Sequence, residues 1–378
     1  MNSTSFRGSA AVKTGVLLVQ LALAGMSANV QAQAQDSEKI FSLSGFGTAA
    51  VTHASVTKGD YVADTFEAKG AGYSGRTSAT TDSKFAAQLD ARFNDSLSAV
   101  LQVVMRSRPD NTFSPEIEWA NVKYAVNKDL SVRLGRTALP MFMVSETRQV
   151  GFASPWLRPP IETYSLYSLT NSDGIDASYR LKTGALNHTF QAWHGKTKVD
   201  TVNAPGSVSH DLKGKITGVA DTIDYGHLSA KIGMTDTDFE LPVPGRILAF
   251  KSKVVNAGAI YDPGAWFVQG EITRTKLGTL QRASLAAYIT AGYRIDQFTP
   301  YLTYSKVKAD DNQIKLALRA QTTTSAGVRW DFMKNMDFKV QVDRVALAKG
   351  STGFYTNVKP GLAGTNGTVI SAAVDFVF

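Results

Sequence analysis

After residue 40, apolar and polar side chains alternate in short runs along most of the chain. In the run SKFAAQLDARF, Phe85, Leu89 and Phe93 fall on one parity, whereas Lys84 and Asp90 fall on the other. A period of two is typical of a strand whose two faces meet different surroundings, because successive side chains point in opposite directions. The pattern therefore predicts strands rather than helices.

Sixteen such runs follow one another, separated by connections that are alternately short and long. The short connections are rich in Asn, Asp and Gly, which favour tight turns. The runs cover 41–51, 83–93, 97–108, 116–126, 130–139, 175–182, 186–196, 212–223, 227–237, 250–261, 265–276, 284–295, 298–308, 322–332, 336–347 and 367–378. The short connections are 94–96, 127–129, 183–185, 224–226, 262–264, 296–297 and 333–335, and the clearest long ones are 56–82, 140–173, 200–211 and 348–366.

This arrangement predicts an all-β chain folded as a 16-stranded antiparallel transmembrane β-barrel. Outer-membrane barrels have short turns at one end and longer loops at the other, and an even strand count lets the first and last strands pair antiparallel. A soluble β-sandwich gives no reason for loop length to alternate. The alternation breaks at 120–125 and at 253–259, where we expect a β-bulge.

The chain ends on an apolar aromatic residue, within the last run. Ile370, Val374, Phe376 and Phe378 share one parity with Ala372, whereas Asp375 has the other. If this strand closes a barrel, its apolar parity faces lipid and Asp375 faces the lumen, and closure leaves no free edge.

The first 34 residues differ in kind from the rest. Arg7 and Lys13 precede the apolar run GVLLVQLALAG, and AQA at 32–34 supplies small residues for cleavage. The run is shorter than the roughly 20 residues of a spanning helix, so we expect a secretory signal peptide at 1–34. The mature domain, 35–378, then has a formal net charge of +6 instead of +8, and no cysteine for disulfides or thiolate metal sites.

Three features together resemble the Gram-negative outer-membrane porins: the signal peptide, the motif VRLGR (132–136) before the longest internal loop, and the terminal Phe378. The resemblance extends over the mature chain through its strand pattern. It implies a homotrimer in the outer membrane, a third long loop that folds inward, and a closing strand that the barrel-assembly machinery recognises. Phe376 and Phe378 are the residues expected to carry this assembly signal.

By position, loop 140–171 corresponds to the constriction loop of that family. It is rich in apolar and aromatic residues, which need a surface to pack against, and the prolines at 155, 159 and 160 keep it stiff. Porins commonly place acidic residues on this loop opposite basic residues on the wall. Here two arginines lie among the acidic residues, which departs from that pattern. The alternative that the chain is related to the anion-selective porins therefore stays open. The expected constriction residues are Glu146, Arg148, Arg158 and Glu162 on the loop and Arg106 and Arg133 on the wall.

Basic residues outnumber acidic ones on the faces that we expect to line the lumen. Rings of Lys and Arg favour anions, and a low-dielectric wall concentrates their field in the pore. Alternatively, these charges form salt bridges across the wall. The expected basic set is Lys84, Arg92, Arg106, Lys123, Arg133, Lys213, Lys215, Lys231, Arg294, Arg329 and Lys339. The expected acidic set is Asp90, Asp221, Glu271, Asp331, Asp337, Asp343 and Asp375.

Other functions have less support. His188 and His194 share a face, but the sequence has neither G-x-S-x-G nor H-E-x-x-H, so a barrel hydrolase is disfavoured. Basic residues are spread over many runs, which argues against nucleic-acid binding. A plugged structural or adhesive barrel remains an alternative, although no loop is long enough for a separate plug domain.

We therefore expect a water-filled channel for passive diffusion of small hydrophilic solutes and ions, with a preference for anions. It would be no enzyme and would need no cofactor or metal. Its partners would be outer-membrane lipid, the barrel-assembly machinery and further copies of itself.

Overall fold

The computed structural model describes residues 40–204, 207–243, 245–278, 282–310 and 319–378. The expected signal peptide, 1–34, lies outside these residues. Within the described ranges, no helix is both long enough and apolar enough to cross a membrane.

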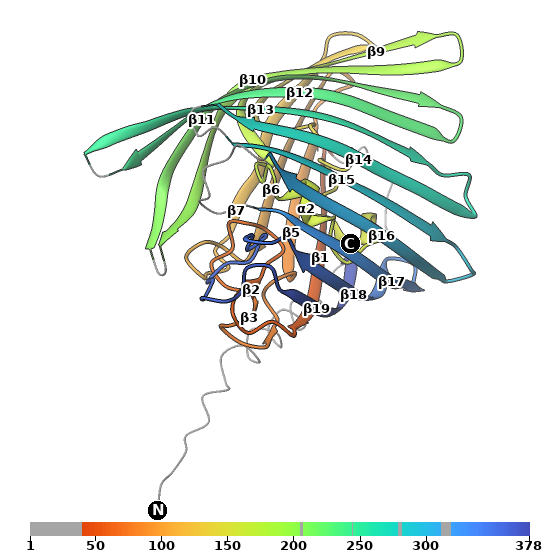
Figure 1. Ribbon diagram of the computed structural model, residues 1–378. Helices are drawn as coiled ribbons and strands as arrows, with labels where there is room; N and C mark the ends of the chain where they lie inside the picture. The colour runs from red at the N-terminus through yellow and green to blue at the C-terminus, as the bar shows by residue number, and fades with distance from the viewer. Residues whose placement is uncertain (1–39, 205–206, 244, 279–281, 311–318) are drawn as a thin grey trace, which may run out of the picture.

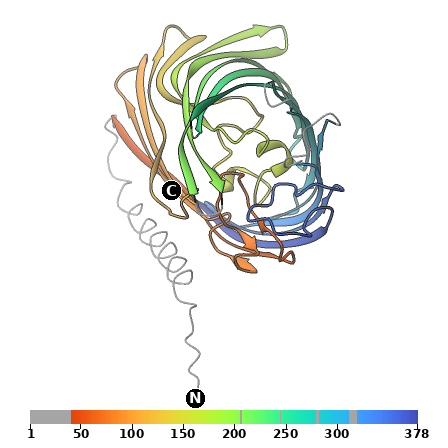
Figure 2. The same ribbon diagram turned by 60° about the vertical axis from the view of Figure 1, so that its left-hand side comes forward.

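Sixteen long antiparallel strands form a closed barrel, as the alternation predicts (Figures 1 and 2). Each strand pairs with its neighbour in sequence, and β1 pairs with both β5 and β19, so the sheet closes on itself. The strands are β1 (Phe41–Ala54), β5 (Lys84–Arg92), β6 (Leu97–Arg106), β7 (Glu116–Ala125), β8 (Leu130–Ala138), β9 (Asn171–Thr183), β10 (Leu186–Ala204), β11 (Ser207–Tyr225), β12 (Leu228–Val243), β13 (Arg246–Tyr261), β14 (Trp266–Leu277), β15 (Arg282–Tyr293), β16 (Phe298–Ala309), β17 (Gln321–Met333), β18 (Met336–Leu347) and β19 (Asn366–Val377).

The prediction of a long loop at 200–211 is wrong. The segment 200–211 belongs largely to β10 and β11, whose pairing continues to Ala204 and Ser207. A strand of 19 residues measures about 60 Å, well beyond the roughly 30 Å hydrocarbon layer, even when tilted. Its outer part therefore lies beyond the lipid, and the hairpin, like that of β12 and β13, projects from the barrel (Figure 1).

The expected bulges also need correction. The β6–β7 register shifts between Gln102 and Val103, which leaves Glu118 as an extra residue just before 120–125. Segment 253–259 pairs without a shift with both of its neighbours. Its alternation breaks because Val254 is buried on the inner face, against the apolar residues of the internal loop.

Two outer loops cover one end of the barrel. Loop 55–83 contains the short strands β2 (Asp60–Tyr61), β3 (Ala71–Gly72) and β4 (Thr77–Ser78), and a bridge joins Asp60 to Thr356 in loop 348–365. Their apolar residues form one cluster with the inner wall. Its members include Tyr61, Ile161, Val307, Val345, Phe354, Tyr355 and Leu362.

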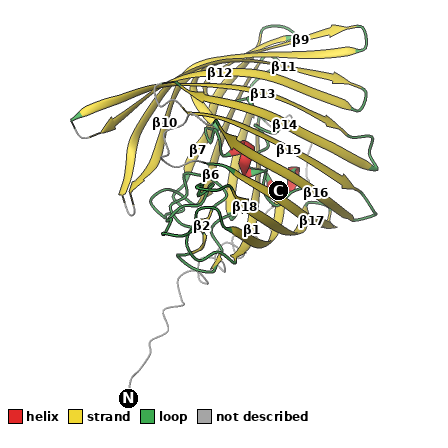
Figure 3. Cartoon of the chain, viewed as in Figure 1, coloured by secondary structure: helices red, strands yellow, loops and turns green. Residues whose placement is uncertain are grey.

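The longest internal loop, 139–170, lies inside the barrel and carries the only helical turns of the described residues (Figures 2 and 3). These are η2 (Gly151–Ala153) and α2 (Ile161–Tyr164). The loop's apolar side chains form the largest buried cluster, with inward-facing residues of the wall. Met141, Phe142, Trp156, Tyr164 and Tyr167 pack there against Trp193, Ile216, Val254 and Tyr288. The inward fold of this loop is therefore confirmed.

The seam between the first and last strands is sealed by aromatic rings over glycines. Gly47 pairs with Phe376, and Gly45 exchanges two backbone hydrogen bonds with Phe378. The rings of Phe376, Phe378 and Phe85 lie 6.0–6.5 Å apart between centroids. Phe376 has the expected outward parity but is only 6% exposed, because its neighbours cover it.

We predict that Gly45→Val weakens barrel closure. A Cβ at Gly45 would lie 2.5 Å from the backbone oxygen of Ala86 and would collide with the Phe378 ring. Overpacking of this kind costs about 1–3 kcal/mol. The folded fraction should fall in a heat-modifiable mobility assay, whereas Gly75→Val, whose Cβ meets nothing closer than 3.6 Å, should behave as wild type. Equal folded fractions for both variants would contradict a sealed seam.

Candidate functional site

Arg158 anchors the internal loop to the wall. Its guanidinium donates two hydrogen bonds of 2.7 Å to the carboxylate of Asp82 and one of 2.7 Å to Asp343. It also donates to the hydroxyls of Ser371 (2.5 Å) and Thr52 (3.3 Å). Bidentate pairing of this kind is both strong and orienting. The loop is thus fixed to β1, β18 and β19 and to loop 55–83.

Glu162, in the helical turn α2 just after Arg158, also holds the loop to the wall. It accepts hydrogen bonds from Ser305 (2.6 Å), Gln321 (2.6 Å) and Thr323 on β16 and β17. Arg158 and Glu162 are 6% and 1% exposed. The prediction that these two charges reach the pore axis is therefore wrong: a loop of this size needs strong polar attachments to the wall, and both residues serve that purpose.

Further contacts hold the rest of the loop. Tyr164 donates to Glu271, and the Trp156 indole donates to Thr290 at 2.9 Å. Arg329 donates to the backbone oxygens of Phe152 and Ser154, and Lys339 donates to that of Gly151. Lys339 also pairs with Asp375 at 2.9 Å. Much of the expected basic wall is therefore occupied with the loop or with neighbouring acidic residues.

The remaining constriction residues lie on the opposite side of the loop, near β5–β9. Arg133 pairs with Asp176 at 2.7 Å and reaches Glu146 at 3.4 Å. Arg148 donates to the backbone oxygen of Tyr164 at 2.9 Å. Arg106 and Arg148 approach one carboxylate, Asp64 of loop 55–83, at 3.6 and 3.7 Å.

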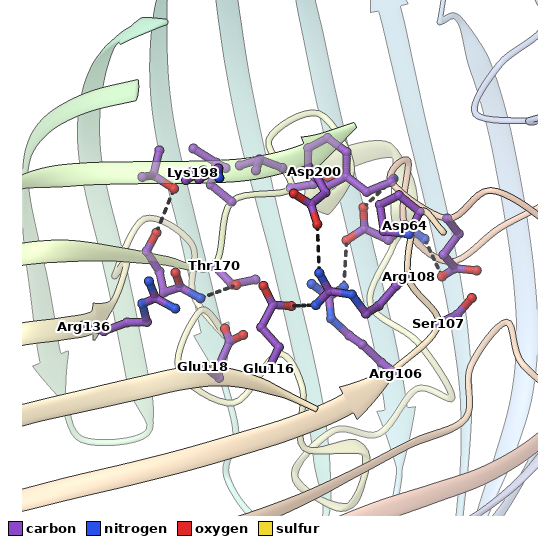
Figure 4. Close-up of a pocket in the computed structure, with 18 residues that line it drawn as sticks. Asp64, Arg106, Ser107, Arg108, Glu116, Glu118, Arg136, Thr170, Lys198 and Asp200 are labelled. Carbon is purple, nitrogen blue, oxygen red and sulfur yellow. Dashed lines mark hydrogen bonds and ion pairs between the residues drawn. The ribbon is translucent and has the colours of Figure 1, made fainter. Parts of the chain in front are cut away.

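A polar cavity of about 280 Å³ opens on this side, beyond the loop (Figure 4). In Figure 4, Arg108 bridges Glu116 and Asp200, each at 2.8 Å, and Glu118 lies between Glu116 and Arg136. A smaller cavity of about 60 Å³ adjoins it. The two cavities share Asp64, Glu67, Arg106 and Ser107, and the smaller one extends to Lys84, Arg148 and Tyr164.

A third cavity, of about 410 Å³, lies toward the short turns. It is lined by Trp156 and Ser154 of the loop, and by Arg329 and the Asp262–Arg294 pair. Polar cavities thus flank the internal loop on both sides.

The expected basic wall is only partly on the open lumen. Lys84 lines the smaller cavity, and Lys123 is an exposed inner-face residue. Arg92 lies at the rim, paired with Asp95 of the turn. Arg329 binds the internal loop, and Arg294 pairs with Asp262.

Three residues of β11 face the opposite way from the prediction. Ile216 and Ala220 are buried in the internal cluster, so Lys213, Lys215 and Asp221, of opposite parity, point outward. Asp221 lies 2.9 Å from His188. The prediction places polar residues in the lumen, but an apolar loop inside the barrel requires apolar residues on the wall beside it.

Sequence reasoning missed the acidic residues of loop 55–83. Asp64, Glu67 and Asp82 meet the arginines of the internal loop or of β6, although nothing in their spacing predicts it. Burial alone would raise the pKa of Asp82, but Arg158 lowers that pKa below its usual range. A lowered pKa means that this pair stabilises the fold at neutral pH and that the contribution is lost as pH falls through the folded-state value.

No protein-family model matches the sequence, and no curated protein matches it either. Solved structures do. The anion-selective porin from Comamonas acidovorans is 15% identical, with a TM-score of 0.59 over 89% of this chain and 99% of that one. Salmonella typhi OmpF is 15% identical, with a TM-score of 0.55 over 89% and 97%. The outer membrane channel DcaP of Acinetobacter baumannii is 12% identical, with a TM-score of 0.57 over 89% and 97%. The chain therefore has the fold of outer-membrane porins and channels.

We predict that Arg158→Gln releases the internal loop. It leaves Asp82 and Asp343 buried without a cationic partner, which costs about 3–5 kcal/mol in the free energy of unfolding. Hydrogen exchange of residues 139–170 should accelerate, and the urea midpoint should fall. The control is Arg294→Gln, which breaks an exposed pair worth less than about 1 kcal/mol. An Arg158 variant as stable and as slow to exchange as wild type would refute the anchor.

Proposed function

We propose that the protein is an outer-membrane porin, a water-filled channel for passive diffusion of small hydrophilic solutes and ions. The observation that carries this proposal is the position of loop 139–170. It is fixed inside a closed barrel by buried polar contacts, with charged cavities on both of its faces. A loop held in this way narrows a passage without filling it.

The channel prefers anions in this proposal, through a small set of basic residues. Lys84, Arg106, Lys123 and Lys231 lie on the inner face, and within the described ranges none of their side chains makes a hydrogen bond. Most other inner bases are neutralised by nearby carboxylates. The preference therefore rests on fewer charges than the sequence suggests, and we expect it to be mild.

The proposal extends to location and assembly. A signal peptide at 1–34 would export the chain, and the outer-membrane lipid would surround the apolar outer face of the barrel. The closing strand, with Phe376 and Phe378, would serve as the signal for the barrel-assembly machinery. A homotrimer is the proposed oligomer, in line with a neighbouring structure that is described as a trimer form.

The alternatives are a plugged structural or adhesive barrel and a barrel hydrolase. The charged cavities beside the loop favour conduction over a plug. His188 contacts Asp221 on the outer face, away from the cavities, so this pair does not support a hydrolytic site in the lumen. We propose no enzymatic activity, no cofactor and no binding of nucleic acid.

Conductance in a planar bilayer tests the channel. The purified protein should give stepwise currents in potassium chloride. A folded, inserted protein that never conducts would favour the plugged barrel.

We predict that Lys84→Gln combined with Lys123→Gln shifts the reversal potential toward cations in a salt gradient. Both lysines face the lumen, and their field reaches an ion in the pore. The shift should shrink as salt rises, because the Debye length falls from about 10 Å at 0.1 M to about 3 Å at 1 M. The matched control removes the same charge from the outer face, by Lys213→Gln with Lys215→Gln, and should leave the potential unchanged. Equal shifts of the reversal potential in the two double variants would mean that the effect does not come from charges in the lumen.

Glu67 gives the selectivity a pH dependence. Burial, strengthened by the charges of Asp64 and Asp82, raises the pKa of Glu67 well above its usual range, so Glu67 becomes negative at a higher pH than an ordinary Glu does. The charged groups that line the smaller cavity with Glu67 are Asp64, Asp82, Lys84, Arg106, Arg148 and Arg158. Those that line the cavity of Figure 4 with it are Asp64, Arg106, Arg108, Glu116, Glu118, Arg136, Lys198 and Asp200.

We predict that the anion preference weakens as pH rises through this raised pKa, because a new negative charge forms beside Arg106. Glu67→Gln should remove that step while keeping the acid-side selectivity. Reversal potentials measured from acid to alkaline pH provide the check. The same pH profile in the variant and in wild type would assign the step to another group.

A further inference from the structure

Two opposite charges on the cavity of Figure 4 lack side-chain hydrogen-bond partners. The side chain of Arg106 makes no hydrogen bond within the described residues, and its nearest carboxylate, on Asp64, is 3.6 Å away. Glu118 has neither a hydrogen bond nor an ion pair in the same part of the chain, although it is only 3% exposed. Both line the cavity of about 280 Å³. Each charge retains unused capacity for a ligand.

The neighbouring charges are already satisfied. Arg108 binds Glu116 and Asp200 at 2.8 Å, so both of these acidic residues already have a cationic partner. Arg136 donates two hydrogen bonds of 2.8 Å to Asp173 and one of 3.0 Å to the backbone oxygen of Ile117. Arg136 lies beside Glu118 in Figure 4 but leaves its carboxylate unpaired.

A bulge in β7 accounts for the position of Glu118. Gln102 pairs with Trp119 and Val103 pairs with Ile117, so Glu118 is the extra residue between them. Bulges re-aim side chains and are frequent beside functional sites. Here the bulge directs a carboxylate into the cavity instead of leaving it on the regular pleat.

A buried carboxylate without a partner is costly, and a cationic group bound there would offset that cost. A guanidinium with free N–H groups binds carboxylates well, and its planar fork favours two hydrogen bonds at once. Arg106 and Glu118 lie on neighbouring strands and influence each other electrostatically without forming an ion pair. A ligand that carries both charges satisfies both residues together.

We propose that this cavity is a binding site for small zwitterions of the amino-acid type. The ligand's ammonium group binds Glu118, and its carboxylate binds Arg106. The cavity volume corresponds to roughly nine waters, which suits a solute of about that number of non-hydrogen atoms. The site rests on the proposed function in one respect: Arg106 also borders the smaller cavity beside the internal loop, so a bound zwitterion lies at the entrance to the narrow part of the channel.

Calorimetry on the folded full-length mature protein in detergent tests the site without any need for conduction. The probes are three molecules of similar shape: L-alanine, L-lactate, which lacks the ammonium group, and isopropylammonium, which lacks the carboxylate. L-Alanine should bind at least tenfold more tightly than either of the others. Glu118→Gln should weaken alanine at least tenfold and leave lactate unchanged. Arg106→Gln should weaken alanine and lactate and leave isopropylammonium unchanged.

The control is Glu240→Gln, which removes one acidic charge from an exposed outward position on β12 and should not alter alanine binding. The comparison of the three probes on wild type needs no variant, so it tests the proposal even if a variant fails to fold. Wild-type protein that binds the three probes equally, or none of them, overturns it. That result leaves the channel proposal intact, whereas a protein that binds alanine but gives no current overturns only the channel.

Discussion

The structure depends on one constraint: a backbone that crosses lipid must satisfy its hydrogen bonds within the protein. A sheet meets that requirement only when it has no edge, so β1 must find β19 at the far end of the chain. Everything inside the barrel follows from that closure. The closed wall provides the inner surface on which loop 139–170 packs, and it supplies the acceptors and donors that hold the loop's charges. The cavities exist because the loop crosses the lumen without filling it, which leaves polar space on both of its sides.

The strand pattern could be predicted because lipid and water impose it on each residue separately. The alternation around Phe85 or Ile370 needs no knowledge of any distant residue, and neither does a turn rich in Asn and Gly. The prediction from parity is wrong where the inner wall meets the apolar internal loop, an environment that is neither lipid nor water. Ile216 and Val254 face inward because the loop offers them an apolar contact, and Lys213 faces outward as a consequence. Similarly, segment 200–211 continues as strand because it lies beyond the lipid, where polarity does not interrupt backbone pairing.

The candidate site was predictable only in part. Arg106, Arg133, Arg148 and Glu146 do lie beside the open side of the loop, and their residue types and positions in the sequence sufficed to propose them. The partners of Arg158 come from segments more than 70 residues away, so neither spacing nor composition reveals that its charge is buried. The direction of Glu118 was missed for a different reason: the broken alternation at 120–125 indicates a bulge nearby, but it does not show which residue the bulge inserts.

The set of residues that binds Arg158 (Thr52, Asp82, Asp343 and Ser371), here called its socket, has a consequence for the order of folding. Thr52 and Ser371 are directly opposite each other across the seam, and one guanidinium nitrogen donates to both hydroxyls. The neighbouring hairpins form from residues close in sequence. The pairing of β1 with β19 closes a loop of more than 300 residues, and because its loop-closure entropy is large, we expect it to form late in folding. Until the two end strands meet, half of the socket does not exist. The internal loop is therefore fixed fully only after the barrel has closed, and in an open barrel it lacks part of its attachment to the wall.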